Sequence, residues 1–136
     1  MSNREAMIDT IQRAYDARGT GNLAEVMAAF HPDNAHFEMK GDKDIVPVVG
    51  AVRGHSNVHA AMDGFIQTFE FVKRDIVDTV VEGNRAVVHS RVQVRFVPKD
   101  VVVTTDVLDT FRFEDGKIVE FIEFADTALI KSLISP

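Results

Sequence analysis

Apolar and polar residues alternate along the last third of the chain, with a short turn sequence between two such stretches. Residues 104–126 read TTDVLDTFRFEDGKIVEFIEFAD, in which Glu114-Asp115-Gly116-Lys117 separates two runs rich in β-branched and aromatic residues. An Asp-Gly pair between alternating runs is typical of a β-hairpin with a tight turn. The pattern therefore predicts two antiparallel strands that are joined at Asp115-Gly116.

Two more apolar runs precede this hairpin and complete a predicted meander. The turn sequences Glu82-Gly83-Asn84 and Pro98-Lys99-Asp100 separate the runs. Gly, Pro and Asn break regular structure at such points because each favours turn conformations. We expect four strands, near residues 70–82, 86–97, 101–113 and 117–125.

Helical spacing marks the beginning of the chain. Over residues 4–18, apolar side chains recur every three or four positions, and Gly19 ends the run. A second helix is expected after Asn22, which can cap it, and before Pro32, which stops it. The first 32 residues are therefore predicted to form a pair of helices.

The middle of the chain contains a short strand, a loop and a third helix. Residues 35–39 are predicted to form the strand, and the charged segment 40–50 is expected to be a loop that borders a site. The third helix is expected to follow Gly54, with Ser56 or Asn57 as its cap. A last short helix is predicted over 126–133, capped by Asp126 or Thr127. Helices followed by a meander indicate an α+β fold.

Asp109 stands out within the predicted strand 101–113. By the two-residue period of a strand, it shares one face with the apolar residues Val103, Val107, Phe111 and Phe113. A buried carboxylate without a partner takes up a proton, and its raised pKa suits a general acid or a neutral hydrogen-bond donor. The alternative is a structural carboxylate that is bonded to a neighbouring element. The pattern leaves both roles open.

Composition limits the classes of partner. The 136 residues suit one domain over 1–136, and a formal charge of -6 without a basic patch argues against nucleic acid. The chain contains no cysteine, which excludes disulfides and thiolate chemistry. The charged residues among the first 19 fit neither a signal peptide nor a membrane span, so we expect a soluble, cytoplasmic protein that has no membrane partner.

The order of these features resembles the nuclear-transport-factor-2-like superfamily, and within it the SnoaL-like and ketosteroid-isomerase-related proteins. The likeness covers nearly the whole chain and is carried by these segments: Gly21-Asn22-Leu23, Phe30 to Phe37, Val52-Arg53-Gly54, Glu82 to Arg85 and Phe111 to Asp126. The resemblance implies a cone-shaped, strongly curved antiparallel sheet wrapped around the N-terminal helices, a cystatin-like α+β barrel. It also implies a pocket in the open end of the cone and a homodimer.

The resemblance also suggests site residues. Asp109 falls in Val107-Leu108-Asp109-Thr110-Phe111, which is similar to the ketosteroid isomerase strand that supplies the aspartic acid of the oxyanion hole. The tyrosine donor of those enzymes would fall on Ala14 or Tyr15. Their general base would fall on Met39, or on Glu38 if the register shifts by one residue; the match of Asn34 to the start of the strand favours Met39.

A second resemblance is to limonene-epoxide hydrolases. Their arginine flanked by two aspartates would fall on Arg91, Gln93 and Glu123, so that only the arginine is kept. Glutamine cannot act as a base, whereas Glu123 could still position a water molecule. By strand alternation, Arg91 lies in a polar row that either faces solvent or lines the cone.

These observations lead to two hypotheses. The first is a cofactor-free acid/base enzyme of the isomerase, cyclase, hydratase or hydrolase type that acts on a small apolar molecule. Asp109 would be its acid, Glu38 or His36 its base and Tyr15 a second donor, while Arg91 and Glu123 would anchor the ligand. The second is a ligand-binding or dimerisation module without catalysis. No metal is expected, because the histidines show no HExxH pattern and His55 and His59 lack further ligands.

Overall fold

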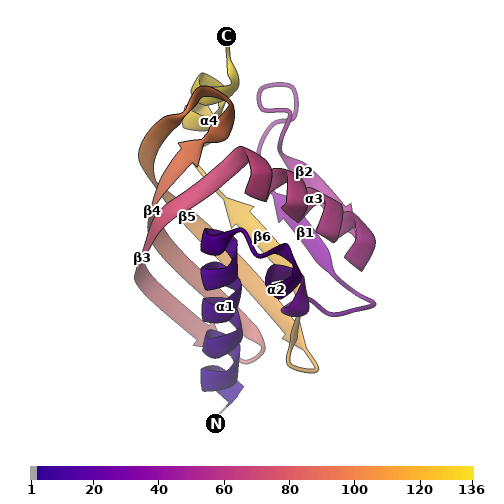
Figure 1. Cartoon of the computed structure of the whole chain (residues 1–136). Helices are drawn as coiled ribbons and strands as arrows, with labels where there is room; N and C mark the ends of the chain where they lie inside the picture. The colour runs from indigo at the N-terminus through magenta and orange to yellow at the C-terminus, as the bar shows by residue number, and fades with distance from the viewer. Residues whose placement is uncertain (1–2) are drawn as a thin grey trace.

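The computed structural model describes residues 3–136 and has an α+β architecture (Figure 1). Its helices are α1 (Asn3–Thr20), α2 (Leu23–Ala28), α3 (His55–Thr68) and α4 (Thr127–Ile134). Its strands are β1 (His36–Met39), β2 (Gly50–Arg53), β3 (Phe69–Glu82), β4 (Arg85–Phe96), β5 (Val101–Glu114) and β6 (Lys117–Phe124), and the 3-10 turn η1 (Val97–Lys99) joins β4 to β5. The four strands of the predicted meander are therefore confirmed to within one or two residues.

The six strands form one curved sheet in the order β2-β1-β6-β5-β4-β3. Neighbouring strands are antiparallel, except that β1 runs parallel to β6. Because β2 and β3 are separate edges, the barrel is not closed. The α+β class and the curved antiparallel sheet packed with helices are confirmed, and the open side leaves space for a cavity.

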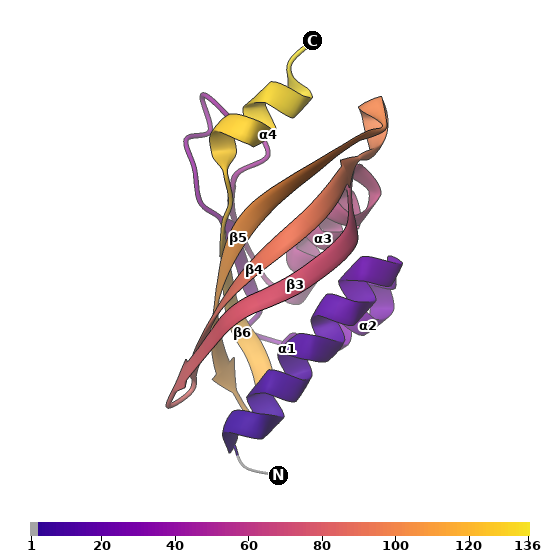
Figure 2. The same ribbon diagram turned by 90° about the vertical axis from the view of Figure 1, so that its left-hand side faces the viewer.

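The helices α1, α2 and α3 lie on one side of the sheet, and α4 lies near the end opposite the N-terminus (Figure 2). No helix among residues 3–136 combines the length and the apolar composition that crossing a bilayer requires. Two groups of buried side chains fill the space between helices and sheet. The larger includes Phe37, Val88, Phe111 and Ile118, and the smaller packs Val92 and Phe96 beneath Leu133 of α4.

Two details differ from the sequence-based expectations. The segment 40–50 does not border the cavity described below, because its apolar residues turn into the core: Val46 is completely buried and Val49 nearly so. The third helix begins at His55, directly after Gly54, rather than after a polar cap. Asn57 instead donates a side-chain hydrogen bond back to the carbonyl oxygen of Arg53 at 2.8 Å.

The turn of the β5–β6 hairpin follows the predicted chemistry. Glu114 pairs with Lys117, and the two residues between them have positive φ angles, 53° for Asp115 and 73° for Gly116. This is the backbone of a type I′ turn, whose twist matches the twist of antiparallel strands. Glycine adopts this conformation without the steric cost that a Cβ brings.

We therefore predict opposite effects of alanine at two exposed glycines. Both Gly116 and Gly64 have open space where a Cβ would stand, but Gly64 lies within α3 and has no positive φ. Gly116→Ala should lower the free energy of unfolding by about 1 kcal/mol, and Gly64→Ala should raise it by about 0.5–1 kcal/mol. Urea unfolding measures both changes, and equal effects at the two sites would contradict the turn assignment.

Candidate functional site

A largely apolar cavity lies on the inner face of the sheet, between α1, α3 and α4. The cavity has a volume of about 90 Å³. Phenylalanine rings make up much of its wall: Phe30, Phe37, Phe65, Phe69, Phe71, Phe111 and Phe121. Polar side chains also line it, among them Tyr15 and Arg18 of α1, Arg74 of β3 and Glu123 of β6. Such a site favours a mostly apolar ligand that has a few polar groups.

Tyr15 and Asp109 join α1 to β5 through a buried hydrogen bond. The Tyr15 hydroxyl donates to Oδ2 of Asp109 at 2.6 Å, and the Asp109 side chain has no exposed surface. Asp109 lies on the inner face of β5, as the two-residue period predicts, but it does not line the cavity itself. Tyr15 lies on the cavity wall, so its hydroxyl connects the cavity to the carboxyl group.

Arg74 lies beside this pair because of an irregularity in β3. Phe71 pairs with Val94 and Lys73 pairs with Gln93, so Val72 is an extra residue in the strand. This bulge reverses the alternation and turns Arg74 toward the inner face. The Arg74 guanidinium stacks 3.7 Å above the Tyr15 ring. Its Nη1 lies 3.8 Å from Asp109 Oδ2 and donates to the Ser90 hydroxyl at 3.0 Å.

Glu123 faces Asp109 as its register partner on β6. Burial raises the pKa of Asp109 well above its ordinary value, and the charge of Glu123 and a hydrogen bond between the two carboxyl groups raise it further. The Tyr15 hydrogen bond and the Arg74 charge act in the opposite direction. Two ionised carboxylates cannot hydrogen-bond to each other, and no protein donor reaches Asp109 Oδ1 within residues 3–136. The raised pKa of Asp109 favours a proton on this group, which would supply that donor.

The same environment keeps Tyr15 neutral. Burial raises the pKa of the Tyr15 hydroxyl far above its ordinary value of 10.0, and the neighbouring Asp109 carboxyl group raises it further. Tyr15 can therefore donate a hydrogen bond but does not act as a phenolate base. The arrangement thus combines a protonated phenol, a protonated carboxyl group and a second carboxyl group at the cavity wall.

Arg18 lies one helical turn beyond Tyr15 and also lines the cavity. Its Nη2 donates to the carbonyl oxygen of Phe65 at 3.2 Å, and its guanidinium lies 4.3 Å from the centre of the Phe71 ring. Its Nη1 is buried and has no hydrogen-bond partner in the described part of the chain. Burial lowers the pKa of Arg18 to about 10, so it remains charged at neutral pH.

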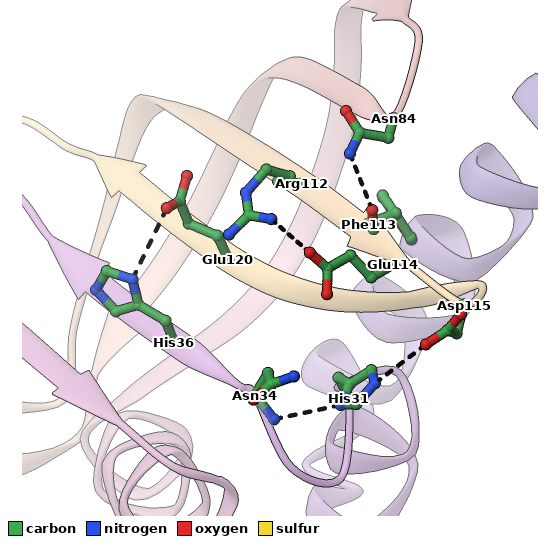
Figure 3. A network of polar contacts seen from close by, with 9 residues as sticks. All are labelled: His31, Asn34, His36, Asn84, Arg112, Phe113, Glu114, Asp115 and Glu120. Atoms are coloured by element: carbon green, nitrogen blue, oxygen red, sulfur yellow. Dashed lines mark hydrogen bonds and ion pairs between the residues drawn. The ribbon is translucent and has the colours of Figure 1, made fainter.

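Two predicted base residues, His36 and Glu38, lie outside the cavity. Strand alternation places them on the face of β1 opposite Phe37 and Met39, and only the latter two line the cavity. His36 Nδ1 points toward Glu120 Oε2, at 3.8 Å (Figure 3), and Glu38 forms an ion pair with Lys40 at 3.0 Å. The placement corrects the proposed base role of both residues. Of the two alternatives in this strand, Met39 faces the cavity.

Arg91 also lies outside the cavity, so its predicted role as an anchor needs correction. Its neighbour Val92 is completely buried on the inner face of β4, which places Arg91 and Gln93 on the outer face. Arg91 forms an ion pair with Asp106 at 3.0 Å, and its side chain is 64% exposed. Of the three positions that the epoxide hydrolase resemblance suggests, only Glu123 reaches the cavity.

Sequence reasoning missed Arg74 and Arg18. Strand alternation counted from Phe71 places Arg74 on the outer face, and no residue in the sequence indicates the bulge that reverses the alternation. The position of Arg18 could have been predicted, because it follows Tyr15 by three positions and shares its side of α1. Asp126 caps α4, as predicted: its Oδ1 accepts a hydrogen bond from the backbone N–H of Leu129 at 3.1 Å.

Comparison with known proteins supports the assignment of the fold. The family described as SnoaL-like domain matches residues 11–121. An NTF2-like protein of unknown function from Burkholderia pseudomallei K96243 is 25% identical, with full coverage of both chains and a TM-score of 0.83. No curated protein matches the sequence.

Two further solved structures share the fold at lower identity. An LEH-like epoxide hydrolase from M. tuberculosis has a TM-score of 0.74 at 16% identity, over 96% of this chain and 90% of that one. TerC, co-crystallised with polyporic acid, has a TM-score of 0.78 at 17% identity, over 95% and 98% of the two chains. At these identities, the likeness shows the fold alone.

The protonation of Asp109 leads to a prediction about stability. The folded protein holds this proton more tightly than the unfolded chain does, so the stabilising contribution of the carboxyl group is lost as the pH rises from about 4 through the raised pKa. Asp109→Asn replaces the protonated group by an amide that donates and accepts in similar positions. The stability of the wild type relative to this variant should therefore fall by about 1.4 kcal/mol for each unit by which the pKa is raised.

Asp106 provides a control on the same strand. Hydrogen bonds from Arg91 and His89 lower its pKa, so its contribution to stability is lost only as the pH falls below about 4. Urea unfolding of the wild type, Asp109→Asn and Asp106→Asn between about pH 4 and 8 measures the difference, which should stay nearly flat for Asp106→Asn. A flat difference for both variants would show that Asp109 is ionised in the folded protein.

Proposed function

The chain belongs to the SnoaL-like family, and from this premise we propose that it is a cofactor-free acid/base enzyme. Its substrate would be a mostly apolar small molecule, and its reaction an isomerisation, cyclisation, hydration or hydrolysis. One observation carries the proposal: Tyr15 and Glu123 line the same apolar cavity, and both are neighbours of the buried Asp109. Two titratable groups that reach one cavity are the minimum for acid/base chemistry.

Glu123 is the base in this proposal. The raised pKa of Asp109 favours its protonated form, so Glu123 is the carboxylate that can accept a proton from a bound substrate. It takes over the role first expected of Glu38 or His36, which lie on the other face of β1. The cavity is largely apolar, so a carboxylate in it is less shielded by water than an exposed one.

Tyr15 is the hydrogen-bond donor to the oxygen that gains charge. When Glu123 takes a proton from the substrate, it can donate that proton in a hydrogen bond to Asp109 Oδ1. The proton of Asp109 can then lie on Oδ2, toward Tyr15, and the Tyr15 hydrogen can turn to the substrate oxygen. In this scheme, Glu123, Asp109 and Tyr15 rearrange their hydrogen bonds together in response to one proton transfer. Arg74, which lies 3.8 Å from Asp109, provides a positive charge beside them.

The similar structures agree with a small molecule in the cavity. They include an epoxide hydrolase and a protein that was co-crystallised with polyporic acid. The second candidate is a ligand-binding module without catalysis, which is favoured by the number of phenylalanine side chains in the cavity wall. The two candidates differ in whether Glu123 and Tyr15 accelerate a proton transfer.

Exchange of hydrogen for deuterium beside the carbonyl group of 2-tetralone tests the proposed function. This flat, apolar ketone loses a proton to a base and forms an enolate, and proton NMR in D₂O follows the exchange. We expect the protein to accelerate the exchange relative to buffer. Glu123→Gln should abolish the acceleration, and Tyr15→Phe should reduce it about a hundredfold, because an oxyanion donor is lost.

Glu38→Gln and His36→Gln are matched controls, because both residues lie outside the cavity. Both variants should exchange the ketone at the wild-type rate. A loss of rate in Glu38→Gln together with full activity in Glu123→Gln would reverse the assignment of the base. Binding of the ketone without any acceleration would favour the binding module.

We also propose that the protein forms the homodimer that the family resemblance implies. Leu108 and Phe124 are register partners on the outer face of β5 and β6, and they are 38% and 44% exposed. Apolar side chains that stand together on a sheet face are candidates for burial against a second copy. Sedimentation equilibrium should show a dimer for the wild type and a monomer for Leu108→Glu. A monomeric wild type would contradict this proposal.

A further inference from the structure

The buried Nη1 of Arg18 is the unexplained group at the cavity. Nη2 of the same side chain donates to the carbonyl oxygen of Phe65, and the guanidinium packs over the Phe71 ring. Nη1 has no hydrogen-bond acceptor among residues 3–136, although it is shielded from solvent. Buried donors of a charged group are rarely left unpaired, because the loss of water is then uncompensated. An acceptor on a ligand would fill this place.

The charges around the cavity indicate which kind of acceptor fits. Arg18 and Arg74 each bring one positive charge to the wall. Burial favours the neutral form of Asp109, which lies 3.8 Å from Arg74, so Glu123 is left as the negative charge opposite the two arginines. The charge of Glu123 also acts on Arg18 and opposes the lowering of its pKa. Arg18 has no ion pair within 4.0 Å in the described residues. Its charge can therefore be neutralised by a ligand that carries one negative charge.

Asp126, the other acidic residue on the cavity wall, does not remove this imbalance. Its side chain is already engaged at the N-terminus of α4, and the residue is exposed to solvent. Water screens an exposed carboxylate and weakens its attraction to a buried cation. Of the two arginines at the cavity wall, Arg18 is therefore the one without a close carboxylate partner in the described residues.

The surroundings of Arg18 describe the body of the ligand. Phe65, Phe69 and Phe71 line the wall near the guanidinium, and Phe111 and Phe121 lie with their ring centres 4.7 Å apart on the sheet. Aromatic walls of this kind accept flat, conjugated molecules through stacked and edge-to-face contacts. The planar guanidinium can offer a second N–H to the same oxygen group, as it does with carboxylates.

We propose that Arg18 is a specificity-determining residue that binds an anionic oxygen, a carboxylate, phenolate or enolate, on a flat and mostly apolar ligand. This inference deepens the proposed function, because it names the ligand class of the same cavity. Arg18 holds the charged end of the ligand, and the phenylalanine rings contact its body. A neutral molecule of the same shape leaves Nη1 unpaired and binds more weakly.

Binding of two matched probes tests the proposal without any turnover. The probes are 2-naphthoate, which is anionic at pH 7, and 2-acetonaphthone, which is neutral and similar in shape. Isothermal titration calorimetry measures both affinities. Tyr15 is the only tyrosine of the chain, so its ring resonances in NMR report whether each probe occupies the cavity. We expect the wild type to bind the anion about tenfold more tightly, or more, than the ketone.

Variants assign the preference to Arg18. Arg18→Met replaces the guanidinium with an apolar side chain and should bind the two probes about equally. Its affinity for the ketone should stay near that of the wild type, which confirms that the cavity is intact. Arg18→Lys keeps the charge and should retain part of the preference. Arg91→Met, which removes an exposed arginine from the outer face, should retain all of it.

Several results would overturn the proposal: equal affinities in the wild type, an unchanged preference in Arg18→Met, or the absence of detectable binding by either probe. If Arg18→Met does not fold, Arg18→Lys and Arg91→Met are compared instead. A weaker preference for the anion in Arg18→Lys than in Arg91→Met supports the role of the Arg18 guanidinium, and an equal preference overturns it. The test is separate from the deuterium exchange of 2-tetralone. A protein that prefers the anion without catalysing exchange loses only the enzyme proposal, and one that catalyses exchange without preferring the anion loses only the role of Arg18.

Discussion

The hydrogen bond between Tyr15 and Asp109 is the interaction on which the site depends. It connects the first helix to the third long strand over 94 positions of sequence, at a point where both side chains are buried. A buried carboxyl group in an apolar row is costly unless its oxygens are bonded. Tyr15 donates to one oxygen, and the raised pKa of Asp109 favours a proton on the carboxyl group. The position of α1 on the sheet is therefore coupled to the protonation state of Asp109.

The polar side chains around Tyr15 and Asp109 also bear on which ligands suit the cavity. Arg74 packs against the Tyr15 ring and lies 3.8 Å from Asp109. Arg18, on the same side of α1 as Tyr15, has an Nη1 without a hydrogen-bond partner in the described residues. One helix thus brings a neutral donor and a cation to a single apolar wall, three positions apart. Under the proposed role of Arg18, such a wall distinguishes the two ends of a ligand.

Local patterns in the sequence predicted most of the fold. Turn residues such as Asp115-Gly116 and the two-residue period of β5 depend on neighbours in the chain, so the hairpin and the inward position of Asp109 could be predicted. The pairing of β1 with β6 and the extra residue Val72 depend on contacts far away in sequence. For that reason Arg74 was missed. His36 and Glu38 were misplaced because alternation indicates that two residues share a face, but not which face is inward.

The same reasoning explains why family resemblance is a limited guide to the chemistry. A shared fold fixes the positions from which side chains can reach the cavity, but each reaction needs particular groups there. The position that the ketosteroid isomerase resemblance assigns to the base holds Met39, which cannot accept a proton, and the chain places a carboxyl group at Glu123 instead. Glu123 faces Asp109 across two paired strands. A base at Glu123, as proposed, therefore lies beside the buried acid, and the charge of Glu123 contributes to the raised pKa of Asp109.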